Sequence, residues 1–165
     1  MSNKSFYSLV NEGVLLGDMN GSVLSTPPVS VTGATLTCTK EVHAGRTTVI
    51  SAVAGCAVTL PAATGTGSVY RFVIGSTITS NSTTIKVANT TDVMTGRAFV
   101  VSDNTAAVLG FATAAASDTI TLNGTTLGGI VGDHIEIIDA ITGTFAVRVF
   151  TAATGTEATP FSATV

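Results

Sequence analysis

The chain has 165 residues, a formal net charge of −3 and only 10% charged side chains, far below the roughly 25% of an average soluble protein. Its seven lysine and arginine residues are scattered singly along the sequence, so no basic patch is predicted and nucleic acid is not expected as a partner. No apolar run approaches the ~20 residues of a membrane helix, so no membrane partner is expected either. No apolar stretch of the secretory type follows the N-terminus, so no secretory signal is predicted.

Residues 1–34 predict an extended arm in front of a domain at 35–165. Two short apolar groups lie in this arm between polar and glycine-containing linkers, and Pro27-Pro28 then keeps the chain extended. The apolar side chains of the arm must pack either on their own domain or on a partner. For Phe6, Tyr7 and Phe161 both alternatives are open. The predicted partner-binding residues are Phe6, Tyr7, Leu9, Val14, Leu15, Leu16 and, near the other terminus, Phe161.

From Thr35 onward, apolar and small polar residues alternate in short segments, most clearly at 68–74 and 144–150. Side chains on a strand point alternately to opposite faces, so these segments predict strands with one buried side. Thirty threonines fit such a pleated, half-exposed surface. The predicted strands are 35–39, 47–53, 57–60, 68–75, 83–88, 97–102, 106–112, 118–122, 133–139, 144–151 and 161–165.

The spacing of these segments and the turn residues between them predict an all-β fold, a β-sandwich or jelly-roll-like domain. Asn123-Gly124 predicts a turn with positive φ. The alanine-rich stretch 112–116 is too short for more than a covering turn. The pentapeptide at 62–66 recurs at 152–156, which indicates two similar loops or a chance repeat in a biased composition.

Six aromatic residues within the strands are predicted to lie in the core. Cys38 and Cys56 sit among alternating residues and lack zinc-site spacing, so we expect free, buried thiols. The predicted core aromatics are Tyr70, Phe72, Phe99, Phe111, Phe145 and Phe150.

The segment Asp133-His134-Ile135-Glu136, with Asp139, is the only compact group of titratable residues. On a strand, His134 and Glu136 would share the polar face while the intervening isoleucine enters the core, so a solvated face is favoured over a metal site. Nucleotide-binding, serine-nucleophile and zinc motifs are absent from the sequence. No catalytic residue, cofactor or metal is therefore predicted, and the chain is not expected to be an enzyme, although distant acids could still meet in space.

The stretch Leu60-Pro61-Ala62-Ala63-Thr64-Gly65-Thr66-Gly67-Ser68-Val69-Tyr70-Arg71-Phe72-Val73-Ile74-Gly75 resembles a family of virion proteins of tailed bacteriophages. The similarity continues through 87–94, 118–126 and 153–162, covers roughly 60–165, and does not include 1–34. It implies a phage structural protein, and the closest functional analogy is with head decoration (cement) proteins, which are often β-sandwich or jelly-roll trimers on the capsid surface.

These observations together lead to the expectation of a capsid decoration protein. It would be made in the bacterial host cytoplasm, bind the outer surface of the major capsid protein shell as a homotrimer, and remain on the virion. Low charge fits a surface that neighbours cover. A tail fibre, spike or receptor-binding module is the alternative, and a cell-wall or glycan hydrolase is a third hypothesis.

Overall fold

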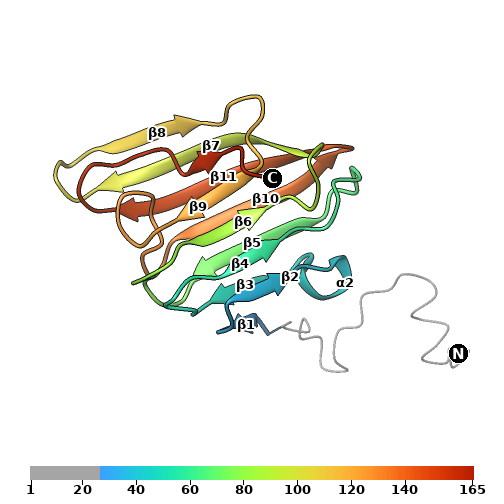
Figure 1. Cartoon of the computed structure of the whole chain (residues 1–165), viewed down its shortest axis with the longest axis horizontal. Helices are drawn as coiled ribbons and strands as arrows, with labels where there is room; N and C mark the ends of the chain where they lie inside the picture. Colours follow the sequence, from blue (N-terminus) through green and yellow to red (C-terminus); the bar gives the residue numbers. More distant parts are fainter. Residues whose placement is uncertain (1–26) are drawn as a thin grey trace, which may run out of the picture.

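Two mixed β-sheets pack into a sandwich in the computed structural model, which describes residues 27–165 (Figure 1). One short helix, α2 (Lys40–His43), accompanies them. The strands are β1 (Val29–Val31), β2 (Thr35–Thr37), β3 (Thr47–Ile50), β4 (Ala57–Thr59), β5 (Val69–Ile74), β6 (Thr83–Lys86), β7 (Val93–Ser102), β8 (Val108–Ala112), β9 (Thr119–Leu122), β10 (His134–Ile141), β11 (Thr144–Ala153) and β12 (Phe161–Ser162). The predicted all-β sandwich is confirmed.

The larger sheet has seven strands in the order β1-β3-β5-β10-β11-β7-β8, and the smaller has five in the order β12-β9-β6-β4-β2. In the first half of the domain the chain alternates between them. Strands β1, β3 and β5 are parallel in one sheet, and β2, β4 and β6 are parallel in the other. The first six strands therefore form a coil, each turn of which adds one strand to each sheet.

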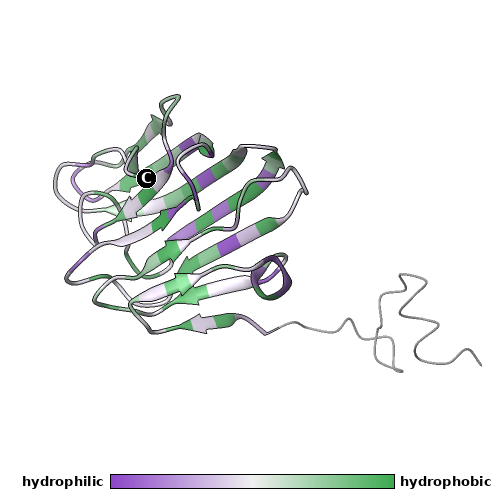
Figure 2. Cartoon of the chain, turned by 45° about the vertical axis from the view of Figure 1, so that its right-hand side comes forward, coloured by the Kyte–Doolittle hydropathy of each residue, from purple (hydrophilic) through white to green (hydrophobic). Residues whose placement is uncertain are grey.

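The register of this coil stacks apolar side chains from successive turns. Val31, Ile50 and Ile74 form a ladder in the larger sheet. Leu36, Val58 and Ile85 form the matching ladder in the smaller sheet, and both belong to or pack against the hydrophobic core. Alternation along each strand places the next residue on the outer face, and the hydropathy bands of Figure 2 show this alternation along the strands of the sheets.

The second half of the domain is built around β7 and β11, which run parallel to each other over ten residue pairs. Strand β10 pairs antiparallel with β11 on one side and with β5 on the other, so it joins the two halves of the larger sheet. Strand β8 pairs with β7 and forms the free edge. Strands β7 and β11 thus lie beside that edge, at the far side of the sheet from β1.

Each of the eleven predicted segments overlaps a strand, with β7, β10 and β11 extending beyond the predicted bounds, and one strand was missed. Strand β1 lies inside the range 1–34 that we assigned to the arm, because its backbone pairs with β3 and so belongs to the larger sheet. Its three residues show too little alternation to be recognised from sequence. Residues 1–26 lie outside the part of the chain that the structure describes.

Local structure at three other sites can be compared with the sequence-based expectation. Helix α2 was not predicted; the buried ring of His43 accepts a hydrogen bond from the backbone N–H of Thr39 at its start (N···N 3.0 Å), a contact that propensity does not reveal. The stretch 112–116 forms no helix, because Ala112 ends β8. Gly124 has the expected positive φ of 77°, so that turn prediction is confirmed.

Both cysteines are buried and free, as predicted. Burial in the core, together with the neighbouring Cys56 thiol, raises the pKa of Cys38 to about 12. Its thiolate is therefore strongly disfavoured, and Cys38 behaves as a small core residue.

Candidate interaction surface

Two phenylalanines stack on the outer face of the larger sheet, near its free edge. Phe99 of β7 and Phe150 of β11 are direct neighbours in the register, with ring centroids 5.4 Å apart and an interplanar angle of 16°. Phe99 is 40% exposed and Phe150 is 50% exposed. Prediction of these two residues as core aromatics was therefore wrong, whereas Tyr70, Phe72 and Phe145 are buried and Phe111 packs partly against the core.

The exposure of Phe150 follows from simple alternation. Phe145 and Phe150 lie on the same strand, five residues apart, and an odd spacing places two side chains on opposite faces. Phe145 faces the core, so Phe150 must face outward. This signal was present in the sequence. Aromatic character alone was the misleading criterion.

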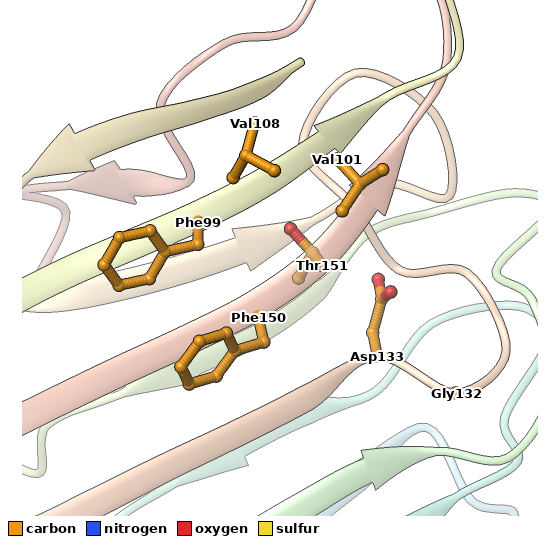
Figure 3. A pocket seen from close by; sticks show the side chains of 7 residues that line it. All are labelled: Phe99, Val101, Val108, Gly132, Asp133, Phe150 and Thr151. Carbon is orange, nitrogen blue, oxygen red and sulfur yellow. The ribbon is translucent and has the colours of Figure 1, made fainter. Parts of the chain in front are cut away.

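Two valines extend the apolar surface beyond the phenylalanine pair. Val101 of β7 and Val108 of β8 are partners in the register and are 52% and 62% exposed. With Phe99 and Phe150 they line an open hollow of ≈ 470 Å³, which Figure 3 shows from close by. We call Phe99, Val101, Val108 and Phe150 the platform. An apolar group of this kind on an exposed face is typical of an interaction site.

A row of charged side chains crosses the outer face next to the platform. In the register, Arg71, Glu136, Arg148 and Arg97 follow one another across β5, β10, β11 and β7. The Arg71 Nε donates to Glu136 Oε2 at 3.2 Å. Within residues 27–165, the side chains of Arg97 and Arg148 make no ion pair or hydrogen bond.

Arg97 and Arg148 are thus like charges directly opposite each other on neighbouring strands, an unfavourable arrangement. Glu136 lies opposite Arg148 on its other side, but within residues 27–165 the ion pair of Glu136 is with Arg71. They line a second hollow of ≈ 360 Å³ that also includes Phe99 and Phe150. The stacked pair therefore separates an apolar hollow from a positively charged one. The sequence showed these arginines as isolated residues, and only strand pairing brings them together.

The acidic residues near the surface mostly serve the fold. Asp133 lines the apolar hollow, but its carboxylate accepts hydrogen bonds from the backbone N–H groups of Gly129 (2.6 Å), Ile130 (3.0 Å) and Ala152 (2.9 Å). Burial outweighs these bonds and raises the pKa of Asp133 above its usual value. The side chain ties a loop to β11 and leaves little capacity for a ligand.

Asp139 fixes a loop in the same way and with more donors. It accepts hydrogen bonds from the backbone N–H groups of Thr64, Gly65 and Thr66 (2.9, 2.7 and 3.0 Å) and from two threonine hydroxyls. Burial alone would raise the pKa of Asp139, but these hydrogen bonds outweigh it and lower the pKa below the usual value. Asp139 therefore stays ionised as the anchor of this loop.

The repeated pentapeptide does form two similar loops. Gly65 and Gly155 both have positive φ, 73° and 79°. The N–H of Gly65 donates to Asp139, and that of Gly155 donates to Asp103 at 3.2 Å. Each copy thus contains a glycine turn held by a carboxylate, which agrees with the loop interpretation, although the first two alanines of the second copy belong to β11.

The predicted polar face of β10 is present. Ile135 and Ile137 are fully buried, while Glu136 points outward. Glu136 forms an ion pair with Arg71, its direct cross-strand neighbour, rather than with His134 of its own strand. Within residues 27–165, no group of three or more histidine, cysteine or acidic residues lies close enough to hold a metal ion.

Phe161 does not present its ring to a partner. It is 7% exposed, lies in β12 opposite Ile120 of β9, and belongs to the core. Its prediction as a partner-binding residue was wrong because the C-terminal strand completes the smaller sheet and buries the ring. The other predicted partner-binding residues lie in 1–26, outside the described residues: Phe6, Tyr7, Leu9, Val14, Leu15 and Leu16.

Comparison with known proteins adds no constraint to this geometry. Among residues 27–165, no helix combines the length and apolar character that crossing a membrane requires. No protein-family model, no curated protein and no solved structure matches the chain.

Proposed function

We propose that the chain is a capsid decoration protein of a tailed bacteriophage. It binds the outer surface of the major capsid protein shell, associates into a homotrimer, and stabilises the shell by contact rather than by catalysis. The observation that carries this proposal is the exposed platform with two arginines beside it. A surface of this composition is costly to leave in water and gains from being covered by another subunit.

Other features support the same proposal. The sequence resembles virion proteins over roughly 60–165, and charged side chains make up only 10% of the chain. The buried aspartates are bonded to backbone groups, so they rigidify loops between strands. A rigid domain with one apolar face suits a protein whose role is to bind, because little ordering entropy is lost on association.

The proposed mechanism is stabilisation of the assembled shell through binding that occurs only in that state. Contacts made only in the assembled shell stabilise that shell in proportion to their affinity, and many copies on one lattice add avidity. The arm carries the shell contact through its first apolar group, Phe6, Tyr7 and Leu9. The folded domain then remains on the outside of the capsid.

The test is the copy number in purified virions, measured by quantitative mass spectrometry against the major capsid protein. Hundreds of copies per particle support a decoration protein. A handful of copies places the protein in the tail. Absence from the virion overturns both hypotheses of a virion protein, the decoration protein and the tail module.

A second experiment tests the arm directly. Full-length protein and a Phe6→Ser/Tyr7→Ser/Leu9→Ser variant are added to undecorated shells, and shell melting is followed by calorimetry. We expect the wild-type protein to raise the melting temperature of the shell and the variant to leave it unchanged. Equal stabilisation by the variant would refute the role of the arm.

A tail fibre or spike module is the second candidate, and one observation favours it. The first six strands wind as a coil with parallel ladders, an arrangement that repetitive and elongated β-proteins extend over many turns. Here the coil stops after strands β1 to β6 and passes into mostly antiparallel pairing, which favours a compact domain. The copy number separates the two candidates.

A further inference from the structure

The platform and its arginines define the spacing that an occupant must have. Along β7, Arg97, Phe99 and Val101 are alternate residues on the outer face, and β11 repeats the first two steps with Arg148 and Phe150. Each step of two residues advances about 6.6 Å along a strand. A matching extended segment therefore needs an acid followed, at alternate positions, by apolar side chains.

Residues 12–18 have this pattern. Glu12, Val14, Leu16 and Asp18 are alternate residues, so an extended chain would present all four on one face. An acid stands at each end and two apolar side chains stand between them. In either direction along the strands, one acid can face the arginine pair while the apolar residues cover the phenylalanines and valines.

The described chain begins at Pro27, beside β1 and far from the platform. This location favours a neighbouring copy as the source of the segment 12–18. Arg46 holds Pro27 beside β1 by donating from Nη2 (2.6 Å) and Nε (3.2 Å) to the Pro27 carbonyl oxygen. Strand β7 lies five strand positions away from β1, which corresponds to about 24 Å. The linker from Asp18 to Pro27 has a root-mean-square length of only about 17 Å if flexible.

We propose that residues 12–18 of one copy bind in extended form across the platform of a second copy, with an acid on Arg97 and Arg148 and with Val14 and Leu16 on the stacked phenylalanines. The described part of the chain begins at the β1 edge of the larger sheet, and the platform lies near the opposite edge. A contact between them from one copy to the next is therefore head-to-tail and closes into a ring when the rotation between copies permits. The inference rests on the self-association included in the proposed function. It leaves Phe6, Tyr7 and Leu9 for the shell.

Charge reversal on each side of this contact, followed by mixing, tests the proposal with full-length protein. Variant A is Glu12→Arg/Asp18→Arg, and variant B is Arg97→Glu/Arg148→Glu, in which both arginines are exposed and the buried faces of the strands are untouched. The control is Lys40→Glu/Lys86→Glu, which changes the net charge as variant B does but lies away from the platform. Self-association is measured by sedimentation velocity, and hydrogen exchange reports protection of residues 12–18.

We expect the wild-type protein and the control to associate with residues 12–18 protected. Variants A and B each lose about tenfold or more in affinity, the scale of close charge pairs across an interface. An equal mixture of A and B regains association between unlike copies, because the acidic segment of B meets the arginines of A and the basic segment of A meets the glutamates of B. A ring of three copies cannot alternate A and B, so the mixture restores two of its three contacts. Circular dichroism melting of each variant confirms that it is folded.

Three outcomes overturn the proposal. Unchanged association of variant B excludes the arginines. The fourfold variant Glu12→Arg/Asp18→Arg/Arg97→Glu/Arg148→Glu combines A and B in one chain. Protection of residues 12–18 in this variant as a monomer, with no association between A and B in the mixture, shows that the segment binds its own domain. A wild-type protein that remains monomeric, with residues 12–18 unprotected up to its solubility limit, excludes the contact altogether. Copy number in virions and shell melting are measured independently of all three outcomes. Failure of the contact alone leaves both results unchanged, whereas a monomeric wild-type protein would also remove the homotrimer from the proposed function.

Discussion

The two faces of strands β7 and β11 differ in how far their side chains are buried and in whether their charged groups have partners, although they belong to the same strands. On the inner face, Phe145 and its neighbours are fully enclosed, and the buried charges nearby are bonded to backbone groups. On the outer face, Phe150 is exposed and Arg148 makes no ion pair within residues 27–165. The inner face is enclosed within the fold, whereas the outer face leaves large apolar side chains exposed to solvent. Substitutions on the inner face should therefore change stability, and those on the outer face should change association.

The largest expected difference separates two phenylalanines of β11. Phe145→Ala should lower the free energy of unfolding by about 4 kcal/mol, because it removes a large side chain from a closed core. Phe150→Ala should cost about 1 kcal/mol, mainly the stacking with Phe99. Urea unfolding at low protein concentration measures both. Equal losses would show that the outer face is as enclosed as the inner one and would break the comparison.

Two glycines of neighbouring strands give the next contrast. A methyl group at Gly96 of β7 would overlap the backbone carbonyl of Val147, whereas one at Gly110 of β8 would meet no atom. We expect Gly96→Ala to destabilise the domain by about 3 kcal/mol and Gly110→Ala to stay within about 0.5 kcal/mol. Thermal melting of the two variants side by side is the measurement. A neutral Gly96→Ala would mean that β7 and β11 can separate without cost.

A pair of charge-removing substitutions sharpens the comparison for polar groups. Asp139→Asn should cost about 2 kcal/mol, because an amide replaces a buried carboxylate that accepts several hydrogen bonds. Arg148→Gln should change stability by less than about 0.5 kcal/mol, since the guanidinium has no partner within residues 27–165. Chemical denaturation gives both values. A costly Arg148→Gln in the monomer would reveal a stabilising role that the structure does not show.

The smallest expected effect is a dependence on pH. The pKa of Asp139 is lowered in the fold, so its ionised form stabilises the protein above the unfolded value near 3.9, and this stability is lost as pH falls toward the folded value. The pKa of Asp133 is raised, so its contribution has the opposite sign and stability falls as pH rises through its folded value. Between pH 5 and 3 the wild-type protein should lose more stability than Asp139→Asn. Parallel curves for the two proteins would contradict this assignment.

Much of the fold was predictable because strand formation leaves a local pattern. Alternation with a period of two located eleven of the strands, and glycine in turn sequences located Gly124 and the two repeated loops. The position of Phe150 was also readable from its odd spacing to Phe145. Strand β1 and helix α2 escaped because each is short and depends on contacts with distant residues: β1 on β3, and α2 on the His43 ring.

The sequence by itself therefore determined the β class, the approximate positions of eleven strands and the alternation of side chains along them, since all three depend on neighbours along the chain. The tertiary structure decided the strand order, the parallel pairing of β7 with β11, and the row that places Arg71, Arg148 and Arg97 beside the platform. These arginines are scattered along the chain and meet only through hydrogen bonding between distant strands. The register of that pairing is set by burial of the inner face, so the composition of the outer surface follows from the packing of the core.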